Sequence, residues 1–302
     1  MNVRAASNRL LALIRTRGGV RDLTIGSGAG VAISLSNRIV TIGTGIMLAR
    51  MLGNEGYGIY AFAIASLGIL GIAAELGLVT FSMREIARAY SVSQIGFLHR
   101  LRDGTAKLSG ISSVSIFVIG QAVIWLVPLN LRVEQQYTLS AMLVVLVANT
   151  RIRIIAASLY GLKRIISAQL LEQLIQPALL FLLTLLVWML VVFGFGPAQA
   201  MLMQIGAACL ALVFGMTLLR KSLPPRPDTQ NEPAIKMLTM ARSGLPFLLI
   251  NAALILNVQV DTLIVGVFIG PAETGIYRVA SQGAVLAQFA ILILQTTAAP
   301  YF

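Results

Sequence analysis

Charged residues divide the chain into long uncharged runs, and these runs predict membrane-spanning helices. Residues 173–219 contain no charged side chain, whereas one helix needs only about 20 apolar residues to cross a bilayer. Gly194-Phe195-Gly196-Pro197 interrupts this run, and Gly and Pro commonly end helices. The run therefore predicts two spans, at roughly 171–193 and 198–219.

Six further apolar runs have the length of a span. One of them, 24–50, contains Arg38 but is otherwise apolar and rich in small residues. The other five are 57–79, 108–128, 137–160, 244–269 and 277–299. The pattern predicts an all-α, polytopic transmembrane bundle of about eight spans whose surroundings are the lipid bilayer. Composition agrees, because 11% of the residues are charged, against roughly a quarter in soluble proteins, and the mean hydropathy is +0.86.

The basic residues predict the orientation of these spans. If the N-terminus is cytoplasmic, the cytosolic segments hold 17 of the 23 Lys and Arg residues. The outer segments then hold only Arg50, Arg132 and Arg278. Because cytoplasmic loops collect Lys and Arg, we expect the N-terminus inside. The net charge of +12 is thus explained by topology, and nucleic acid is not expected as a partner.

The sequence contains few residues for bond-making chemistry. Cys209 is the single cysteine and His99 the single histidine, which argues against a disulfide framework and a Cys/His metal site. His99 is interpreted as a polar loop residue. With no phosphate-binding glycine loop and no paired carboxylates at one site, we expect no cofactor, no metal and no enzymatic activity.

Loop lengths suggest the organisation of the chain. Residues 1–23 carry five arginines and one acid, which predicts a cytosolic basic leader lying on anionic headgroups. Two long cytosolic loops are predicted, at 80–104 and 220–243, and the second contains Pro224-Pro225-Arg226-Pro227-Asp228. This proline-rich segment indicates a linker. It divides a first six-helix lobe, 24–219, from the first two helices of a second lobe, 244–302.

One segment occurs twice with a fixed offset of 217 residues. Met51-Leu52-Gly53-Asn54-Glu55-Gly56-Tyr57-Gly58-Ile59-Tyr60-Ala61 follows the first span, and Phe268-Ile269-Gly270-Pro271-Ala272-Glu273-Thr274-Gly275-Ile276-Tyr277-Arg278 follows the seventh. An even number of spans separates the copies, so both have the same orientation. This arrangement is typical of transporters built from two parallel repeats, with the substrate between the lobes near the midplane.

The same segments carry a resemblance to a known family. Leu48-Ala49-Arg50-Met51-Leu52-Gly53-Asn54-Glu55-Gly56-Tyr57-Gly58-Ile59-Tyr60 resembles the first outer turn of the bacterial polysaccharide (O-antigen, Wzx-type) flippases. Asp261-Thr262-Leu263-Ile264-Val265-Gly266 with Gly275-Ile276-Tyr277 resembles the turn that opens their second half. These flippases belong to the multidrug/oligosaccharidyl-lipid/polysaccharide exporter superfamily.

The resemblance implies a function and a location. It implies flipping of a lipid-linked oligosaccharide, on an undecaprenyl-type pyrophosphate, across the bacterial inner membrane by alternating access, with H⁺ or Na⁺ coupling. Members of that family have about twelve to fourteen spans, so the eight predicted here indicate a first lobe and the start of a second, apparently truncated one. The alternatives are a multidrug or lipid II exporter of the same superfamily and a non-transporting truncated membrane protein.

Arginines within the spans are candidate substrate ligands, because charges in the membrane are costly and usually functional. Arg38 lies deep in the first span on a small and polar face with Ser27, Gly30, Ser34, Thr41 and Gly45. Such a face is expected to meet a neighbouring helix or a wet cavity. The guanidinium fork suits bidentate capture of a pyrophosphate, and replacing Arg38 by Ala is expected to abolish export.

Arg151 and Arg153 are the other two candidates. Two residues on a helix differ by about 200° of rotation, so the two side chains are not expected to enter one cavity. One of them is expected to serve the cavity and the other to reach the headgroups. Asn149 shares a face with Arg153, which favours Arg153 slightly and leaves Arg151 open.

Acidic and amide side chains are candidates for ion coupling or for contacts between lobes. Asp261 lies in the outer part of the seventh span with Asn257 one turn away, and it has three possible roles: pairing with an Arg, binding a cation, or a plain hydrogen bond. Glu75 and Glu172 are expected near the inner boundary, solvated by headgroups. Gln173, Gln176 and Pro177 predict a locally polar or kinked helix start beside Glu172. Four tyrosines are expected in the interfacial belt: Tyr57, Tyr60, Tyr137 and Tyr277.

Overall fold

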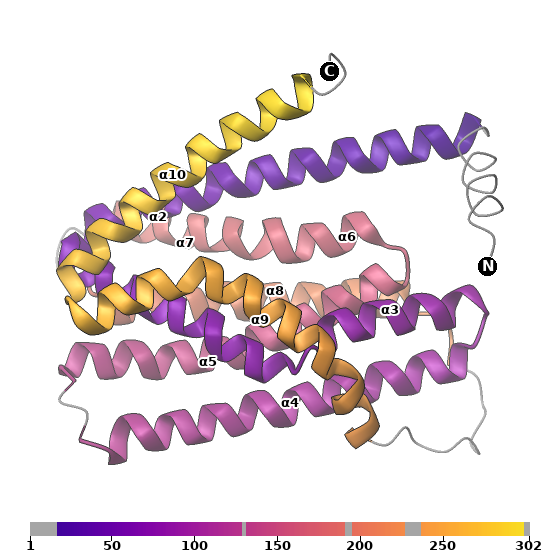
Figure 1. Ribbon diagram of the computed structural model, residues 1–302, viewed down its shortest axis with the longest axis horizontal. Coiled ribbons are helices and arrows are strands. Elements are labelled where there is room, and N and C mark those ends of the chain that lie inside the picture. The colour runs from indigo at the N-terminus through magenta and orange to yellow at the C-terminus, as the bar shows by residue number, and fades with distance from the viewer. Residues whose placement is uncertain (1–16, 129–130, 191–194, 227–236, 299–302) are drawn as a thin grey trace.

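The computed structural model describes residues 17–128, 131–190, 195–226 and 237–298, and the side chains of 29–128, 131–190, 195–226 and 237–284. All regular structure in these ranges is helical (Figure 1). The elements are α2 (Arg17–Glu75), α3 (Leu78–Ser91), α4 (Ile95–Leu126), α5 (Val133–Gly161), α6 (Ile165–Gln169), η1 (Leu170–Ile175), α7 (Gln176–Leu190), α8 (Pro197–Ser222), α9 (Met237–Phe268) and α10 (Pro271–Ala298).

Within the described ranges, six helices are long and apolar enough to cross a membrane. The first of them, Ala29–Glu75, is divided at Gly53, whose φ of 67° and ψ of −179° are not helical. The helix therefore reverses there and contributes two of the predicted spans. These features confirm the polytopic helical bundle. α10, where the eighth span was predicted, is not among the six.

Two segments predicted as long loops are largely helical. Residues 80–104 form most of α3 and the start of α4, joined by a short turn in which Ser93 has a φ of 57°. The predicted linker 220–243 begins as the last turn of α8 and ends as the first turns of α9, while 227–236 lie outside the described residues. Its Pro224 lies against α4, because the Pro224 carbonyl hydrogen-bonds His99 Nε2 at 3.0 Å. His99 is thus buried inside α4, and its interpretation as a loop residue was wrong.

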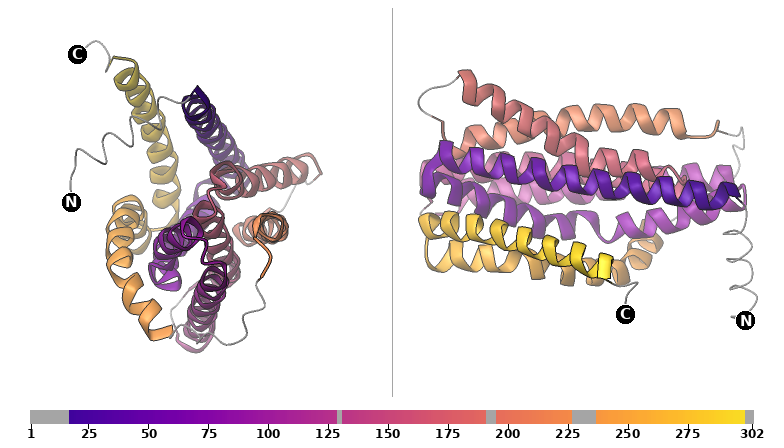
Figure 2. Two further views of the ribbon diagram at one scale, coloured as in Figure 1. Left: turned by 90° about the vertical axis from the view of Figure 1, so that its right-hand side faces the viewer. Right: turned by 90° about the horizontal axis from the view of Figure 1, so that it is seen from above.

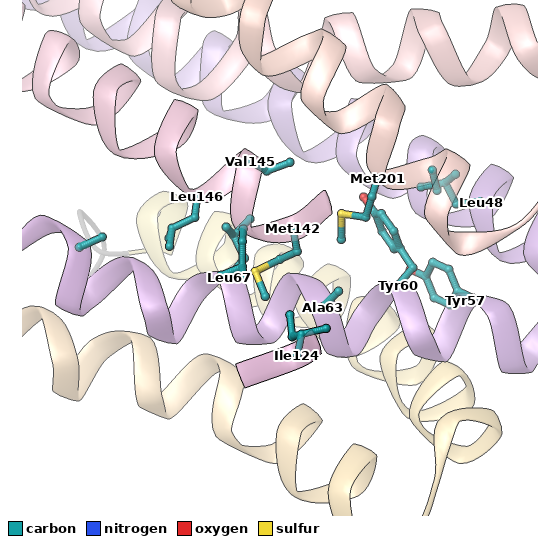
Figure 3. Packing of buried hydrophobic residues seen from close by; sticks show 13 residues of the cluster. Leu48, Tyr57, Tyr60, Ala63, Leu67, Ile124, Met142, Val145, Leu146 and Met201 are labelled. Atoms are coloured by element: carbon teal, nitrogen blue, oxygen red, sulfur yellow. The ribbon is translucent and has the colours of Figure 1, made fainter. Parts of the chain in front are cut away.

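The main core lies where α2, α4, α5 and α8 meet. Figure 3 shows Met142 and Leu146 of α5 beside Leu67 of α2, and Met201 of α8 belongs to the same buried cluster. Small residues such as Ala63 and Ala200 are fully buried there, which lets the helices approach closely. Close approach is how helices associate in lipid, where burial of apolar surface alone gives no advantage. Large apolar side chains such as Leu126 and Met189 point outward, as expected for surfaces that face lipid.

Helices α9 and α10 pack against α2, on the side of the bundle away from α7 and α8 (Figure 2, left). α9 crosses the bundle at the break between α2 and α3, where Leu76 and Gly77 both have positive φ. A Cβ atom at Gly77 would overlap the Gly244 carbonyl oxygen, and one at Gly244 would lie 2.5 Å from the Leu76 carbonyl oxygen. This crossing therefore depends on two glycines in backbone contact.

The two copies of the repeated segment contact each other at equivalent positions. A Cβ atom at Gly58 would overlap the Pro271 carbonyl oxygen, and one at Gly275 would overlap the Asn54 carbonyl oxygen. Gly58 is equivalent to Gly275, and Asn54 to Pro271, by the same offset of 217. The contact is therefore reciprocal, as expected for two segments related by a local two-fold axis. We refer to the Gly58–Gly275 pair as the glycine contact.

Candidate functional site

Two adjoining cavities lie between α2, α5, α7 and α8 on one side and the α9–α10 pair on the other. The larger, of about 440 Å³, is called the ionic cavity because Glu75, Arg153 and Glu172 line it. The smaller, of about 280 Å³, is called the aromatic cavity because Tyr57 and Tyr60 line it. Three residues line both: Ile64, Gln176 and Gln204. The cavities thus form one polar region reaching from the end of α2 toward the glycine contact.

Arg153 lies between two carboxylates in the ionic cavity. Its Nη1 donates to Glu75 Oε1 at 2.6 Å, and its Nε lies 3.6 Å from Glu172 Oε1. Glu75 is 4% exposed, so the expectation that headgroups solvate it was wrong. A buried carboxylate persists as a charge only when it is paired, and Arg153 supplies that pair. We call Arg153, Glu75 and Glu172 the ionic cluster, whose formal charge is −1.

Three separate elements bring the ionic cluster together. Glu75 is the last residue of α2, and Arg153 is in the second half of α5. Glu172 belongs to η1, a π-helical turn over 170–175 that ends two residues before Pro177. A π turn widens the helix and is frequent at functional sites. The polar or kinked helix start predicted from Gln173, Gln176 and Pro177 is therefore observed as this turn.

Amide side chains extend the polar lining beyond the charges. Gln176 Nε2 donates to Asn149 Oδ1 at 2.8 Å, and Ser34 Oγ donates to Gln173 Oε1 at 3.1 Å. The Oε1 atoms of Gln204 and Gln259 are buried in the ionic cavity without a protein partner among the described residues. Buried acceptors of this kind suit a water, a cation or the hydroxyl groups of a ligand.

The aromatic cavity is lined by residues of both repeated segments. Tyr57 and Tyr60 stack with ring centroids 6.2 Å apart, and Tyr57 Oη accepts a hydrogen bond from Gln282 Nε2 at 3.0 Å. Both tyrosines are buried, so their assignment to the interfacial belt was wrong. Tyr137 is exposed and contacts Trp125 edge to face, as expected for that belt. Arg278 places a positive charge at this end of the polar region.

Arg151 lies on the other side of α5 from the ionic cluster. Its Nη1 donates to the Ala106 carbonyl at 2.6 Å, and it lines a separate groove together with Arg102 and Arg220. The structure thus places Arg151 and Arg153 in different cavities, as the rotation between them predicts.

Arg38 is exposed on α2 and lines neither cavity. Its neighbours on the polar face do contact other elements, because Gly30 lies against Gln169 and Gly45 against Gln282. The side chain of Ser27 lies outside the described residues. The structure therefore does not bring Arg38 together with the ionic cluster.

Asp261 and Asn257 are both exposed on α9 and line neither cavity. Asp261 Oδ2 accepts a hydrogen bond from Tyr277 Oη at 3.2 Å, which is the plain interhelical bond among its three predicted roles. The residues of α9 that do enter the ionic cavity are Ile255 and Gln259, on the opposite face.

Sequence analysis missed several polar residues of these cavities. Gln204, Gln259 and Gln282 lie within apolar spans, and an uncharged amide inside a span is itself a signal for a polar partner or a cavity. Charged side chains alone do not reveal these three positions. Among the described residues, no group of three His, Cys, Asp or Glu side chains is arranged to hold a metal ion.

Comparison with known proteins gives one match. The family model described as polysaccharide biosynthesis protein matches residues 26–302, almost the whole chain. No curated protein and no solved structure matches the chain.

Proposed function

The chain belongs to the polysaccharide biosynthesis protein family, and on this basis we propose that it is a flippase for a lipid-linked oligosaccharide. The proposal places it in a bacterial inner membrane with the N-terminus inside. It moves the sugar headgroup between leaflets by alternating access. The observation that carries the proposal is the polar region that α9–α10 covers, with Arg153 at one end of it.

Arg153 is the residue that recognises the substrate in this proposal. A guanidinium presents a planar fork of donors that matches two oxygens of a pyrophosphate. In the structure Glu75 and Glu172 occupy those donors. An anionic headgroup therefore competes with the two carboxylates for Arg153.

This competition links substrate binding to a cation. The ionic cluster has a formal charge of −1, so a pyrophosphate that displaces Glu75 would leave a buried carboxylate beside another anion. Such a state is too costly unless the carboxylate takes up a proton or pairs with Na⁺. Cation uptake with headgroup binding, and release with headgroup release, would couple movement of the headgroup to movement of the cation in the same direction. Asp261, with Asn257 beside it, is a second candidate cation site, at the interface with α10.

The glycine contact is the closed end of the transport path in this proposal. Backbone atoms of the two repeated segments meet there, so no headgroup passes between them in this conformation. Separation of the α9–α10 pair from α2 would open this end. A contact made of backbone and small residues releases without breaking an ion pair, which suits a gate that opens in every cycle.

A second function is favoured by one observation. Two carboxylates face one arginine in the ionic cavity, so an exporter of cationic molecules would also find a suitable site there. Removing the positive charge of Arg153 distinguishes the two functions. It would abolish transport of an anionic headgroup and would improve binding of a cation.

The experiment compares Arg153→Ala and Arg153→Lys with the wild type in vesicles reconstituted with the full-length protein and a lipid-linked diphosphate oligosaccharide. We expect Arg153→Ala to lose flipping and Arg153→Lys to keep a small part of it, because Lys retains the charge without the fork. Arg88→Ala is the matched control, since its side chain is 80% exposed at the end of α3. Wild-type flipping by Arg153→Ala would overturn the proposal.

A further inference from the structure

The groove that contains Arg151 is separate from the transport path and combines charge with apolar surface. It has a volume of about 360 Å³ and lies between α4, α5 and α8. Arg102, Arg151 and Arg220 line it, together with apolar side chains that include Ile155, Leu212 and Met216. We call it the basic groove. From it we infer a binding site for one anionic phospholipid, with the phosphate at the arginines and an acyl chain along α8.

The charges of the basic groove favour an anion. Asp103 is the acidic residue of its lining, and it already pairs with Arg102 and with Arg226, whose Nη1 lies 3.6 Å from Asp103 Oδ2. Among the described residues, no carboxylate lies within ion-pair distance of Arg151 or Arg220. The four arginines and one aspartate sum to a formal charge of +3. Basic pockets between helices near a membrane surface are typical sites for phospholipid headgroups.

The guanidinium of Arg151 is held in place by the helix opposite. Its Nη1 donates to the Ala106 carbonyl at 2.6 Å, and its Nη2 lies over Gly110, where a Cβ atom would overlap it. Gly110 is on the same face of α4 as Ala106, one turn later. The groove is therefore built to present this charge, because a larger residue at 110 would block the path of the side chain.

The basic groove lies at the depth in the bilayer where a phospholipid headgroup is expected. Arg102 and Arg220 lie just outside uncharged stretches, since α4 has no charged residue from 108 to 126 and α8 has none before Arg220. Leu212 and Met216 continue from the arginines into the apolar part of α8. A phospholipid aligned with the bilayer would place its phosphate and its chain in this same order. The inference requires only membrane insertion and not flippase activity.

The natural single cysteine gives a local probe. Cys209 is exposed on α8, three residues before Leu212 and seven before Met216, and therefore lies on the same helical face. A bimane fluorophore on Cys209 of the full-length protein would be quenched by a brominated lipid in the groove. The experiment uses phosphatidylcholine vesicles that contain either brominated phosphatidylglycerol or brominated phosphatidylcholine at equal bromine content.

We expect the wild type to be quenched more strongly by phosphatidylglycerol. Arg151→Gln and Arg220→Gln should each lower the apparent preference about fivefold, the loss that corresponds to one basic residue near an anionic surface. Gly110→Ala should lower it as well without changing any charge. Arg88→Gln, which removes one charge from an exposed side chain at the same end of the bundle, should leave it unchanged.

Equal quenching by the two lipids in the wild type would overturn the inference. An equal loss of preference in Arg88→Gln and Arg151→Gln would overturn it too. Such a result would show that the overall positive charge at this end of the bundle, and not the groove, attracts the anionic lipid. If inorganic phosphate abolishes the preference, the groove is a site for a free anion and not for a lipid. Gel filtration of each variant checks folding, and Arg151→Lys, which keeps the charge, should keep part of the preference.

Discussion

The two ends of the polar region are built on different principles. At one end the ionic cluster joins Glu75, Arg153 and Glu172 through charged side chains. At the other end Gly58 and Gly275 join the repeated segments through backbone contact, and no charge takes part in the contact. In the proposed cycle the ionic end binds and selects the headgroup, while the glycine end closes through shape and can open without exposing an unpaired charge.

The glycine end gives the largest expected effect. Gly58→Ala and Gly275→Ala each place a methyl group where backbone atoms now lie, so the segments must separate. Overpacking costs about 1–3 kcal/mol, and more where backbone must move, so transport should fall about tenfold or further. Because the contact is reciprocal, the two substitutions should give matching losses in a vesicle flipping assay.

The control for this pair is Gly283→Ala. Gly283 belongs to the same helix as Gly275, and a Cβ atom there would meet nothing within 4 Å. Transport by the Gly283→Ala variant should stay at the wild-type level. If Gly58→Ala is also fully active, the glycine contact is not part of the transport cycle.

At the ionic end, the two carboxylates should differ in importance. The Glu75 side chain is 6% exposed and lies 2.6 Å from Arg153, whereas the Glu172 side chain is 30% exposed and lies 3.6 Å away. Glu75→Gln should therefore reduce the turnover number several-fold and lower KM, because Arg153 is freed for the headgroup. Glu172→Gln should do the same more weakly. Glu85→Gln, outside the cavity, is the matched control, and equal effects of all three would contradict the assignment.

Replacing Arg38 tests whether the exposed face of α2 belongs to the proposed transport path. It lies outside both cavities, so it would meet the headgroup only on its way to or from the ionic cluster. Arg38→Ala should then raise KM more than it lowers the turnover number. Complete loss of turnover would favour the expectation from sequence that Arg38 itself holds the pyrophosphate.

The smallest effect is expected from the hydrogen bond near the glycine end. Gln282→Ala removes the hydrogen bond to Tyr57 Oη and should destabilise the contact between α10 and α2 by about 0.5–1.5 kcal/mol. Tyr57→Phe removes the same bond from the other side. Thermal denaturation should show similar shifts for both, and the double variant should be no worse than the single ones.

The sequence predicts the spans better than the contacts between them. Apolar runs between charges locate the helices because lipid penalises charge, and the offset of 217 residues identifies the segments that meet at Gly58 and Gly275. The segment 80–104 was misjudged because counting charges cannot detect an amphipathic helix. The buried residues of α3 do follow a helical period: Leu78, Phe81, Ser82 and Ile86.

The candidate site was predicted only in part. The rotation between residues 151 and 153 correctly separates the two arginines, since helix geometry alone decides it. The pairing of Arg153 with Glu75 could not be foreseen, because the two residues are 78 positions apart in the sequence. It also depends on where α2 ends, at Glu75. The burial of Tyr57 and Tyr60 depends likewise on packing against other helices, including α8, which no local pattern records.

The most direct test of the central claim measures how binding of a lipid-linked diphosphate depends on the cation. If the headgroup displaces Glu75 from Arg153 and the carboxylate takes up one proton, affinity falls as pH rises, by at most about tenfold per pH unit. If Na⁺ is the coupling ion, affinity rises with Na⁺ concentration instead. In either case the Glu75→Gln side chain has no negative charge for a proton or Na⁺ to neutralise. The affinity of this variant should therefore no longer depend on pH or on Na⁺. Binding by the wild type that is independent of both pH and Na⁺ would contradict the account.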